Sequence, residues 1–405
     1  MTGAQQQADW STPRVSPVAL NDRESFREKA FHRESPLRRL DWVVLFCAVA
    51  LSGIGAVLVW SATRAAMEAA GGDPRAFLKR HVLNVLIGLA LGAIAALVDY
   101  RMLRAYAPIV YIASTIGLVA VLSPLGSVIN NARSWIVIGG GFQVQPSEFA
   151  KVALVVGMAM ILGEKRDNEA DPRDGDVLLV LAMAAVPMGL IMLQPDLGTM
   201  MVFVFTILGV LAVSGAPRRW VAGLVILGVL SGWGILHFHM LEDYQEARLT
   251  SFANPEADAR DTGYNVNQAK IAIGSGRVTG KGLFQGTQTN GEFIPEQQTD
   301  FVFTVAGEEL GFVGAGTILL LLGVVLWRGT RIAVNAGDMF GTLVAAGVVS
   351  WFAFQSFVNI GMTLGIMPVT GLPLPFVSYG GSAMFANFMA IGLLCNVKMR
   401  SNSWD

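Results

Sequence analysis

The stretch 285–312, QGTQTNGEFIPEQQTDFVFTVAGEELGF, joins a long polar segment to an apolar run, and Asp300 lies at the junction. A carboxylate at the edge of the hydrocarbon is costly, so one that stays there usually pairs, binds a ligand or takes part in a reaction. Glu308 and Glu309 follow about two helical turns later in an otherwise apolar sequence. The junction predicts a membrane helix with the functional site near Asp300, and we keep Glu308 and Glu309 outside the catalytic set.

Composition extends the membrane interpretation to the whole chain. Of the 405 residues, 53% are hydrophobic and only 15% are charged, and the mean hydropathy is +0.52, far from the balance of a soluble domain. Lipid offers no partner for free backbone groups, so apolar runs long enough to cross it must be helices. We expect an all-α integral membrane bundle of about ten transmembrane helices. The predicted spans lie near 42–63, 81–99, 103–123, 147–163, 177–193, 197–215, 219–239, 301–327, 339–364 and 382–397.

The placement of basic residues predicts the orientation of this bundle. With the N-terminus inside, short loops such as those holding Arg101 and Arg218 are cytoplasmic, and roughly eighteen basic residues lie inside against roughly ten outside. The loop from Arg64 to Arg80 is the counter-evidence, because this topology places it outside. We therefore expect both termini to be cytoplasmic.

Two long polar segments accompany the spans. Residues 1–40 are polar and lack helical periodicity, which predicts a disordered cytoplasmic tail before a transmembrane domain at 41–400. Residues 240–300 form a large extracytoplasmic loop between the seventh and eighth spans, in which 264–273 has the pattern of an amphipathic helix on the membrane surface. The glycines at 274–282 lack the spacing and the preceding strand of a P-loop, so nucleotide binding there is rejected.

The segment 145–151, QPSEFAK, is the first candidate motif. Its proline and serine indicate a helix start, which places Glu148 in the first turn, where a carboxylate suits the helix dipole. Glu148 and Lys151 are three residues apart and can pair on one face. A structural ion pair near the interface is one interpretation. The apolar run after Lys151 favours the other, an ammonium group that faces a polar cavity.

Two further turns on the same side of the bundle carry polar groups. Asp196, in the short turn QPDLGT, either caps the helix that follows or contributes to a site. Arg133 stands near Trp135 and is either an interfacial anchor or a binding residue. The residue types alone leave these alternatives open.

The loop 366–382 is apolar but too rich in proline and glycine for a regular helix. Irregular backbone at membrane depth survives only where protein or a watery cavity surrounds it. The loop is therefore either a packed re-entrant cap or part of a site. In the second case its end, with Ser378, Gly380 and Gly381, opens the last helix and offers amide groups to a phosphate.

The predicted topology places Asp300 and all these groups at the outward ends of their helices. Basic side chains and helix-start amides suit an anionic head group such as pyrophosphate, and Asp300 could act as a general base. An enzyme at this place takes its substrate from the outer leaflet and cannot depend on cytoplasmic nucleotides. A lipid-linked sugar donor meets both conditions.

Six motifs, in this order, resemble the SEDS family of shape, elongation, division and sporulation proteins. They are 131–135 NARSW, 145–151 QPSEFAK, 194–199 QPDLGT, 295–301 PEQQTDF, 307–311 GEELG and 373–382 PLPFVSYGGS. The resemblance implies ten transmembrane helices and a peptidoglycan glycosyltransferase of the bacterial plasma membrane, with an extracytoplasmic active site. It also implies lipid II and the growing glycan chain as ligands, a class B penicillin-binding protein as partner, and no nucleic acid. It leaves a divalent cation open as cofactor.

The resemblance also implies roles for individual residues. The family's essential acid falls on Asp300, its cavity ion pair on Glu148 and Lys151, and its conserved arginine on Arg133. Asp196 matches a further acidic position, and we place it among the substrate-binding residues with the glycines that open the last helix.

The glutamines before Thr299 and the proline-rich run 367–375 resemble RodA more than FtsW, which predicts a role in cell elongation and shape. Two other classes of function stay open. One is a transporter that moves the lipid-linked precursor across the bilayer, and the other is a non-catalytic scaffold for a penicillin-binding protein. A transporter predicts ionisable residues along the bilayer midplane, whereas here they cluster at the outward side.

Overall fold

A computed structural model describes residues 39–129, 132–139, 142–164, 172–237 and 262–401 of the chain. From Asp41 onward the chain forms one compact unit. The predicted tail at 1–40 lies almost entirely outside the described residues, and so does the first part of the predicted outward loop. The tail, the domain boundaries and the membrane sides of the termini and loops stay predictions.

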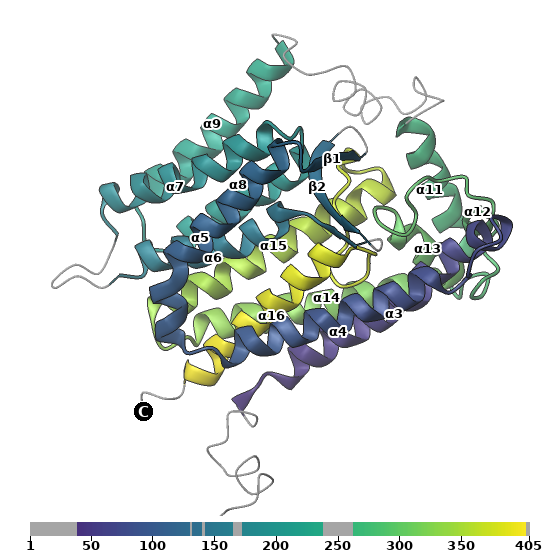
Figure 1. Cartoon of the computed structure of the whole chain (residues 1–405), viewed down its shortest axis with the longest axis horizontal. Coiled ribbons are helices and arrows are strands. Elements are labelled where there is room, and N and C mark those ends of the chain that lie inside the picture. Colours follow the sequence, from purple (N-terminus) through teal and green to yellow (C-terminus); the bar gives the residue numbers. More distant parts are fainter. Residues whose placement is uncertain (1–38, 130–131, 140–141, 165–171, 238–261, 402–405) are drawn as a thin grey trace, which may run out of the picture. The chain divides into compact units, whose positions relative to one another are not determined.

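Helices make up most of the described chain (Figure 1). They are α3 (Trp42–Ala69), α4 (Ala76–Leu97), α5 (Tyr100–Leu122), α6 (Pro146–Leu162), α7 (Asp174–Met192), α8 (Leu197–Val213), α9 (Arg218–His237), α11 (Thr262–Gly276), α12 (Thr287–Asn290), α13 (Val302–Glu309), α14 (Gly311–Val334), α15 (Met339–Leu364) and α16 (Gly381–Ser401). In the described part, seven are long and apolar enough to cross a membrane, namely α3, α4, α5, α7, α14, α15 and α16. The prediction of a multi-pass helical membrane protein is confirmed, and the number ten stays a prediction.

The middle of the bundle is formed by α15 and α16. In each of them 78% of the most apolar window is buried inside the protein, against 17% to 50% in the other five. α15 packs on α6, α8 and α14, and α16 packs on α4 and α6. Side chains on α15 therefore point at protein on most sides, and polar ones must find partners there.

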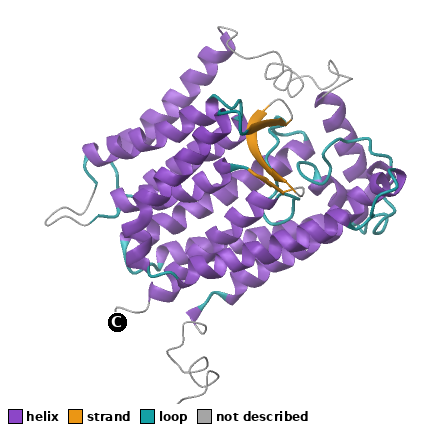
Figure 2. Cartoon of the chain, viewed as in Figure 1, coloured by secondary structure: helices purple, strands orange, loops and turns teal. Residues whose placement is uncertain are grey.

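A small antiparallel sheet follows α5 and was not predicted (Figure 2). Its strands are β1 (Gly126–Ile129), β2 (Ala132–Gly139) and β3 (Phe142–Val144), in that order. The all-α prediction is wrong for this segment. A run of isoleucine, valine and tryptophan between an Asn-Asn pair and three glycines is a hairpin signal that could have revealed it.

The predicted eighth span is broken at Gly311, where α13 ends and α14 begins. Gly311 has φ +66, and a Cβ atom there would lie 2.2 Å from the backbone nitrogen of Gly280, so only glycine fits. The first free amides of α14 donate to the preceding loop, from Phe312 N to Arg277 O (2.9 Å) and from Val313 N to Val278 O (3.0 Å). The segment that precedes α13 thus caps α14.

The amphipathic pattern at 264–273 does form a helix, α11, but its buried face packs on protein. Val266, Ala269 and Ala272 are buried, and α11 contacts α13. A Cβ atom on Gly276 would lie 1.9 Å from the carbonyl oxygen of Gly307, so the two backbones touch. The predicted membrane-surface helix is therefore a cover over α13.

Glu308 connects the segment 281–289 to α13 through hydrogen bonds. Its buried carboxylate accepts hydrogen bonds from Lys281 Nζ (2.8 Å), the Gln288 amide (2.9 Å), and the amide (2.9 Å) and hydroxyl (2.8 Å) of Thr289. Burial alone would raise the pKa of Glu308, but these donors outweigh it and hold the pKa below its ordinary value. These contacts give Glu308 a structural role.

Replacing Glu308 by Gln is expected to lower the free energy of unfolding by about 2 kcal/mol, because the charge that these donors stabilise is lost. Since the pKa is lowered in the folded protein, this stabilisation is present above the ordinary glutamate pKa and is lost as the pH falls below it. Thermal unfolding in detergent and limited proteolysis within 281–289 measure the effect, with the exposed Glu292→Gln as control. Equal melting temperatures and digestion patterns for the two variants would contradict this role.

Candidate functional site

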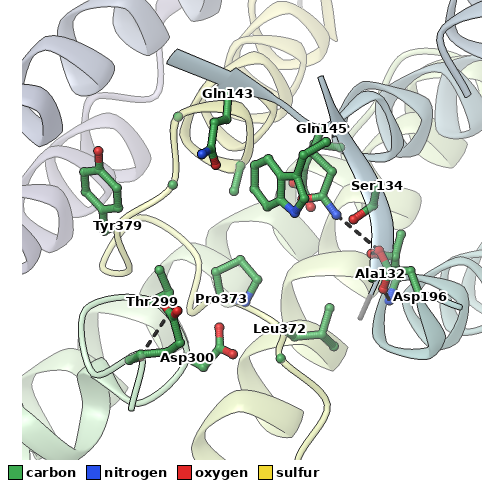
Figure 3. A pocket seen from close by; sticks show the side chains of 18 of the residues that line it. Ala132, Ser134, Gln143, Gln145, Asp196, Thr299, Asp300, Leu372, Pro373 and Tyr379 are labelled. Atoms are coloured by element: carbon green, nitrogen blue, oxygen red, sulfur yellow. Dashed lines mark hydrogen bonds between the residues drawn. The ribbon is translucent and has the colours of Figure 1, made fainter. Parts of the chain in front are cut away.

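A cavity of about 480 Å³ opens among the ends of several helices (Figure 3). Its wall comes from α4, from strands β2 and β3, from the first turns of α6, α8 and α16, and from the turn and loop before α13 and α16. The polar side chains among its lining residues are Arg80, Asn84, Ser134, Gln143, Gln145, Glu148, Asp196, Thr199, Glu296, Gln298, Thr299, Asp300, Thr370 and Tyr379. Its size suits a ligand of several sugar or phosphate groups.

Helix N-termini converge on this cavity. Gln145 and Glu148 stand at the start of α6, Asp196 at the start of α8, and Gly381 at the start of α16, and all four line the cavity. The N-terminal end of a helix carries free amides and a partial positive charge. Anionic groups are therefore favoured on this side of the cavity.

Asp300 lies in a tight turn that precedes α13, and its carboxylate faces the cavity (Figure 3). The Asp300 amide donates to the Glu296 carbonyl (3.0 Å), which closes the turn. Two contacts from other elements fix the turn in place. The Tyr379 amide donates to the Gln298 carbonyl (2.8 Å), and Asn359 Nδ2 donates to the carbonyl of Asp300 itself (2.8 Å).

The loop between α15 and α16 is irregular, as predicted, and forms the wall next to Asp300. A Cβ atom on Gly371, which has φ +72, would lie 3.4 Å from Asp300 Oδ2. Phe376 is buried with φ +66 and packs edge to face on Phe352 (5.3 Å) and Phe388 (5.5 Å). This aromatic stack fixes the strained residue, and with it the loop.

The predicted ion pair forms at the base of the site. Lys151 Nζ lies 2.8 Å from Glu148 Oε1, and their side chains are 1% and 2% exposed. Lys151 also donates to Gln355 Oε1 (3.2 Å) and lies over the Trp351 ring at 4.6 Å. Glu148 lines the cavity, and its second oxygen has no hydrogen-bond partner in the described chain.

Asp196 caps α8 and also lines the cavity. Its Oδ1 accepts from the Thr199 amide (3.0 Å), which caps α8, and its Oδ2 accepts from the Thr199 hydroxyl (2.8 Å). Oδ2 also accepts from Gln145 Nε2 (3.1 Å), drawn as a dashed line in Figure 3. Asp196 therefore lines the cavity while it ties α8 to the start of α6.

Five of the predicted site residues line one cavity, and three do not. Those that line it are Asp300, Glu148, Asp196, Gly380 and Gly381. The side chains of Arg133, Lys151 and Ser378 are used elsewhere. Arg133 Nε donates to the Gly126 carbonyl within the sheet (3.2 Å). The Ser378 hydroxyl accepts from the Leu374 amide (2.8 Å) and shapes the loop, and Lys151 is sealed behind Glu148.

Arg80 was missed as a candidate. It is exposed, and it is the one cationic side chain among the described lining residues. Asn84 lines the cavity one helical turn further along α4. From the sequence, Arg80 was used only as evidence on topology. Its position four residues before Asn84, at the edge of an apolar span, was a signal that could have identified it.

The lining carries more negative than positive charge. Its carboxylates are Glu148, Asp196, Glu296 and Asp300, against Arg80. Among the described residues no group of three or more His, Cys, Asp or Glu side chains could hold a metal ion. The donor set of a resident metal ion is thus not found in that part of the chain.

A family model for cell cycle proteins of the FtsW, RodA and SpoVE type matches residues 41–403. Stage V sporulation protein E of Bacillus subtilis is 39% identical over 362 residues, which cover 89% of this chain and 97% of that protein. The peptidoglycan glycosyltransferase MrdB of Escherichia coli is 36% identical, with 90% and 96% covered. A probable peptidoglycan glycosyltransferase FtsW of Geobacter metallireducens is 35% identical, with 90% and 96% covered.

Solved structures agree. A chain from a peptidoglycan synthase complex that coordinates polymerisation and crosslinking matches with a TM-score of 0.74 and 31% identity over 90% of this chain and 99% of that chain. The rod shape determining protein RodA of Thermus thermophilus matches with a TM-score of 0.65 and 30% identity, with 90% and 98% covered. The chain therefore belongs to the SEDS family of cell cycle proteins, which includes FtsW, RodA and SpoVE.

Proposed function

We propose that this protein is a peptidoglycan glycosyltransferase that polymerises lipid II on the extracytoplasmic side of the plasma membrane. The observation that carries the proposal is Asp300, a carboxylate held at the wall of a cavity on which helix N-termini converge. The names of the relatives support the reaction class, because MrdB and FtsW are peptidoglycan glycosyltransferases. The cavity wall combines a base with an anion-binding surface. Glycosyl transfer from a sugar pyrophosphate needs both.

Asp300 is the proposed general base. It takes the proton of the C4 hydroxyl of the acceptor's terminal N-acetylglucosamine while that oxygen attacks the anomeric carbon of N-acetylmuramic acid on the donor. The bond to undecaprenyl pyrophosphate breaks, and the leaving group carries its charge away without a proton. A single displacement converts the α-linked donor to a β-1,4 bond, so one carboxylate suffices.

Arg80 and the helix N-termini are proposed to stabilise the leaving pyrophosphate. Gly380 and Gly381 place the first amides of α16 in the cavity wall, where no side chain screens them. The sequence predicted Arg133 and Lys151 as basic groups for the anionic head group, but neither lines the cavity. Arg133 donates to Gly126 within the sheet, and Lys151 pairs with Glu148. Electrostatic stabilisation at the leaving group is strongest from groups that are fixed before the reaction begins.

The activity is tested with purified protein, labelled lipid II and moenomycin, which silences classical glycosyltransferases. Glycan strands formed without any partner would support the enzyme and exclude a scaffold that has no catalysis of its own. A protein that forms no strands, but moves labelled lipid II between the leaflets of a vesicle, would support the transporter instead. The same assay with a class B penicillin-binding protein tests the proposed partnership, which the likeness to a synthase complex supports.

Replacing Arg80 by Gln is expected to lower kcat/KM for lipid II about 10- to 100-fold, because one charged hydrogen bond to the pyrophosphate is lost. Arg75→Gln is the matched control, since Arg75 is exposed, lies one turn earlier at the start of α4 and stacks over Trp60 at 5.6 Å outside the cavity. Native kinetics in Arg80→Gln, or equal losses in both variants, would remove Arg80 from the site.

The preference for a RodA-like role in elongation is a further proposal, since members of all three branches are similarly related to this chain. Depletion of the protein from its own cells tests it. Rounded cells that still divide would support the elongation role, and filaments with unfinished septa would support a role in division.

A further inference from the structure

Three polar side chains form a line along one face of α15. Trp351, Gln355 and Asn359 are spaced by four residues, so they point in the same direction. All three are 0% exposed, and Gln355 and Asn359 are the two amide side chains of a helix whose other polar side chains, apart from Trp351, are serines and threonines. Buried amides are costly unless they make hydrogen bonds, so what they bind indicates why they are there.

Gln355 and Asn359 hold two successive carbonyls of the loop beside Asp300. Gln355 Nε2 donates to Pro373 O (2.7 Å), and Asn359 Nδ2 donates to Leu372 O (2.7 Å). Leu372 and Pro373 both line the cavity. The loop has no strand or helix of its own to satisfy these groups, so α15 supplies the donors that strands or helices supply elsewhere.

The same face reaches the proposed base and the ion pair. Asn359 Nδ2 also donates to the Asp300 carbonyl (2.8 Å), so one amide group joins the base's own residue to the cavity loop. Gln355 Oε1 accepts from Lys151 Nζ (3.2 Å) and from Trp351 Nε1 (2.6 Å). The line of side chains therefore runs from the buried ion pair to the backbone of Asp300.

We propose that Asn359 is a positioning residue for Asp300. It fixes the backbone from which the carboxylate extends, and it fixes that backbone relative to the wall at Leu372. The Asn359 Oδ1 atom is buried without a hydrogen-bond partner in the described chain, so the side chain is retained at a cost in stability. The inference rests on the proposed role of Asp300 as base.

Asn396 provides a matched control for this proposal. It is also 0% exposed, and its Nδ2 also donates to two carbonyls, Ala95 O and Val98 O, both at 2.8 Å. It lies on α16 near the opposite end of that helix from the cavity residue Gly381. Loss of two hydrogen bonds from Nδ2 is therefore common to both positions, and Asn396 additionally accepts from Arg400 Nε at Oδ1 (3.0 Å). Only Asn359 contacts the Asp300 turn.

The test compares Asn359→Leu with Asn396→Leu in the lipid II assay. Both changes keep the branched side-chain shape and remove both donors, so both are expected to lower the melting temperature. Only Asn359→Leu is expected to lower kcat, about 10- to 100-fold with KM nearly unchanged, because displacement of a catalytic group by about 1 Å has effects of this size. If Asn359→Leu does not accumulate, Asn359→Asp keeps the shape, removes at least one donor, and is expected to lower kcat in the same way.

A double variant separates positioning from general damage. If Asn359 acts through Asp300, then Asn359→Leu lowers kcat no further once Asp300 is already Asn. Three results would each overturn this inference alone. The first is a double variant in which the losses of kcat from Asn359→Leu and Asp300→Asn multiply. The others are equal losses of kcat in Asn359→Leu and Asn396→Leu, and full activity of Asn359→Leu when Asp300→Asn is slow. Full activity of Asp300→Asn would overturn the proposed base and the inference together.

Discussion

Asp300→Asn is expected to slow the polymerisation of lipid II by about 10²–10⁴-fold, the range over which a general base contributes to a reaction. The side chain keeps its size, and the contacts that fix the turn involve the backbone, through Asp300 N to Glu296 O and Asn359 Nδ2 to Asp300 O. The fold and the binding of lipid II should therefore survive. Steady-state kinetics with labelled lipid II and moenomycin give kcat and KM separately, and the loss should lie in kcat.

Glu292→Gln is the control for this experiment. It changes a carboxylate to an amide in the same polar segment, at an exposed position that is not among the lining residues of the cavity. We expect it to polymerise lipid II at the native rate. An Asp300→Asn protein that melts at the native temperature and matches the rate of Glu292→Gln would exclude Asp300 as base.

The site residues that could be predicted are those whose chemistry conflicts with their surroundings. A carboxylate at the edge of an apolar run, such as Asp300, is costly in a membrane and therefore usually has a function. Pro146 at a helix start placed Glu148 in the first turn, and the spacing to Lys151 then predicted a pair that the structure contains. These inferences are local, and local geometry is what a single sequence encodes best.

The residues that were misplaced depend on features that a local pattern does not carry. On β2, Ala132, Ser134 and Trp135 line the cavity and Arg133 does not. Arg133 lies between Ala132 and Ser134, and successive side chains of a strand point to opposite faces. Without the strand, and without its register, the direction of Arg133 could not be known. Arg80 was missed because α4 is brought to the cavity by packing on α16, which lies about 300 residues later in the chain.

The break at Gly311 shows the same limit on the scale of a whole span. The sequence from 301 to 327 is continuously apolar apart from Glu308 and Glu309, so hydropathy alone predicts one helix. The break depends on the contact of Gly311 with Gly280, about thirty residues earlier, and on the loop carbonyls that satisfy the first amides of α14. Its consequence for the site is that α13 follows Asp300 as a separate short helix.

The buried ion pair carries the second large effect. Lys151→Met is expected to lower the free energy of unfolding by about 3–5 kcal/mol, because it leaves the carboxylate of Glu148 uncompensated in a site that is 2% exposed. The change also removes the donor to Gln355. Thermal unfolding in detergent measures the loss. Lys79→Met, which breaks an ion pair with Asp73 in which the side chains are 69% and 47% exposed, should leave the melting temperature nearly unchanged.

The double variant Glu148→Gln with Lys151→Met decides whether the pair serves stability or the reaction. Replacing both charges removes the uncompensated carboxylate, so most of the lost stability should return. Polymerisation should not return with it, because the carboxylate charge of the lining residue Glu148 and the Lys151 contact to Gln355 are both still missing. A double variant that recovers both stability and the native kcat would show that the pair contributes to folding stability only. Recovery of stability without kcat would show that the charges are kept for the site, since a neutral pair of similar size on α6 fills the same buried space.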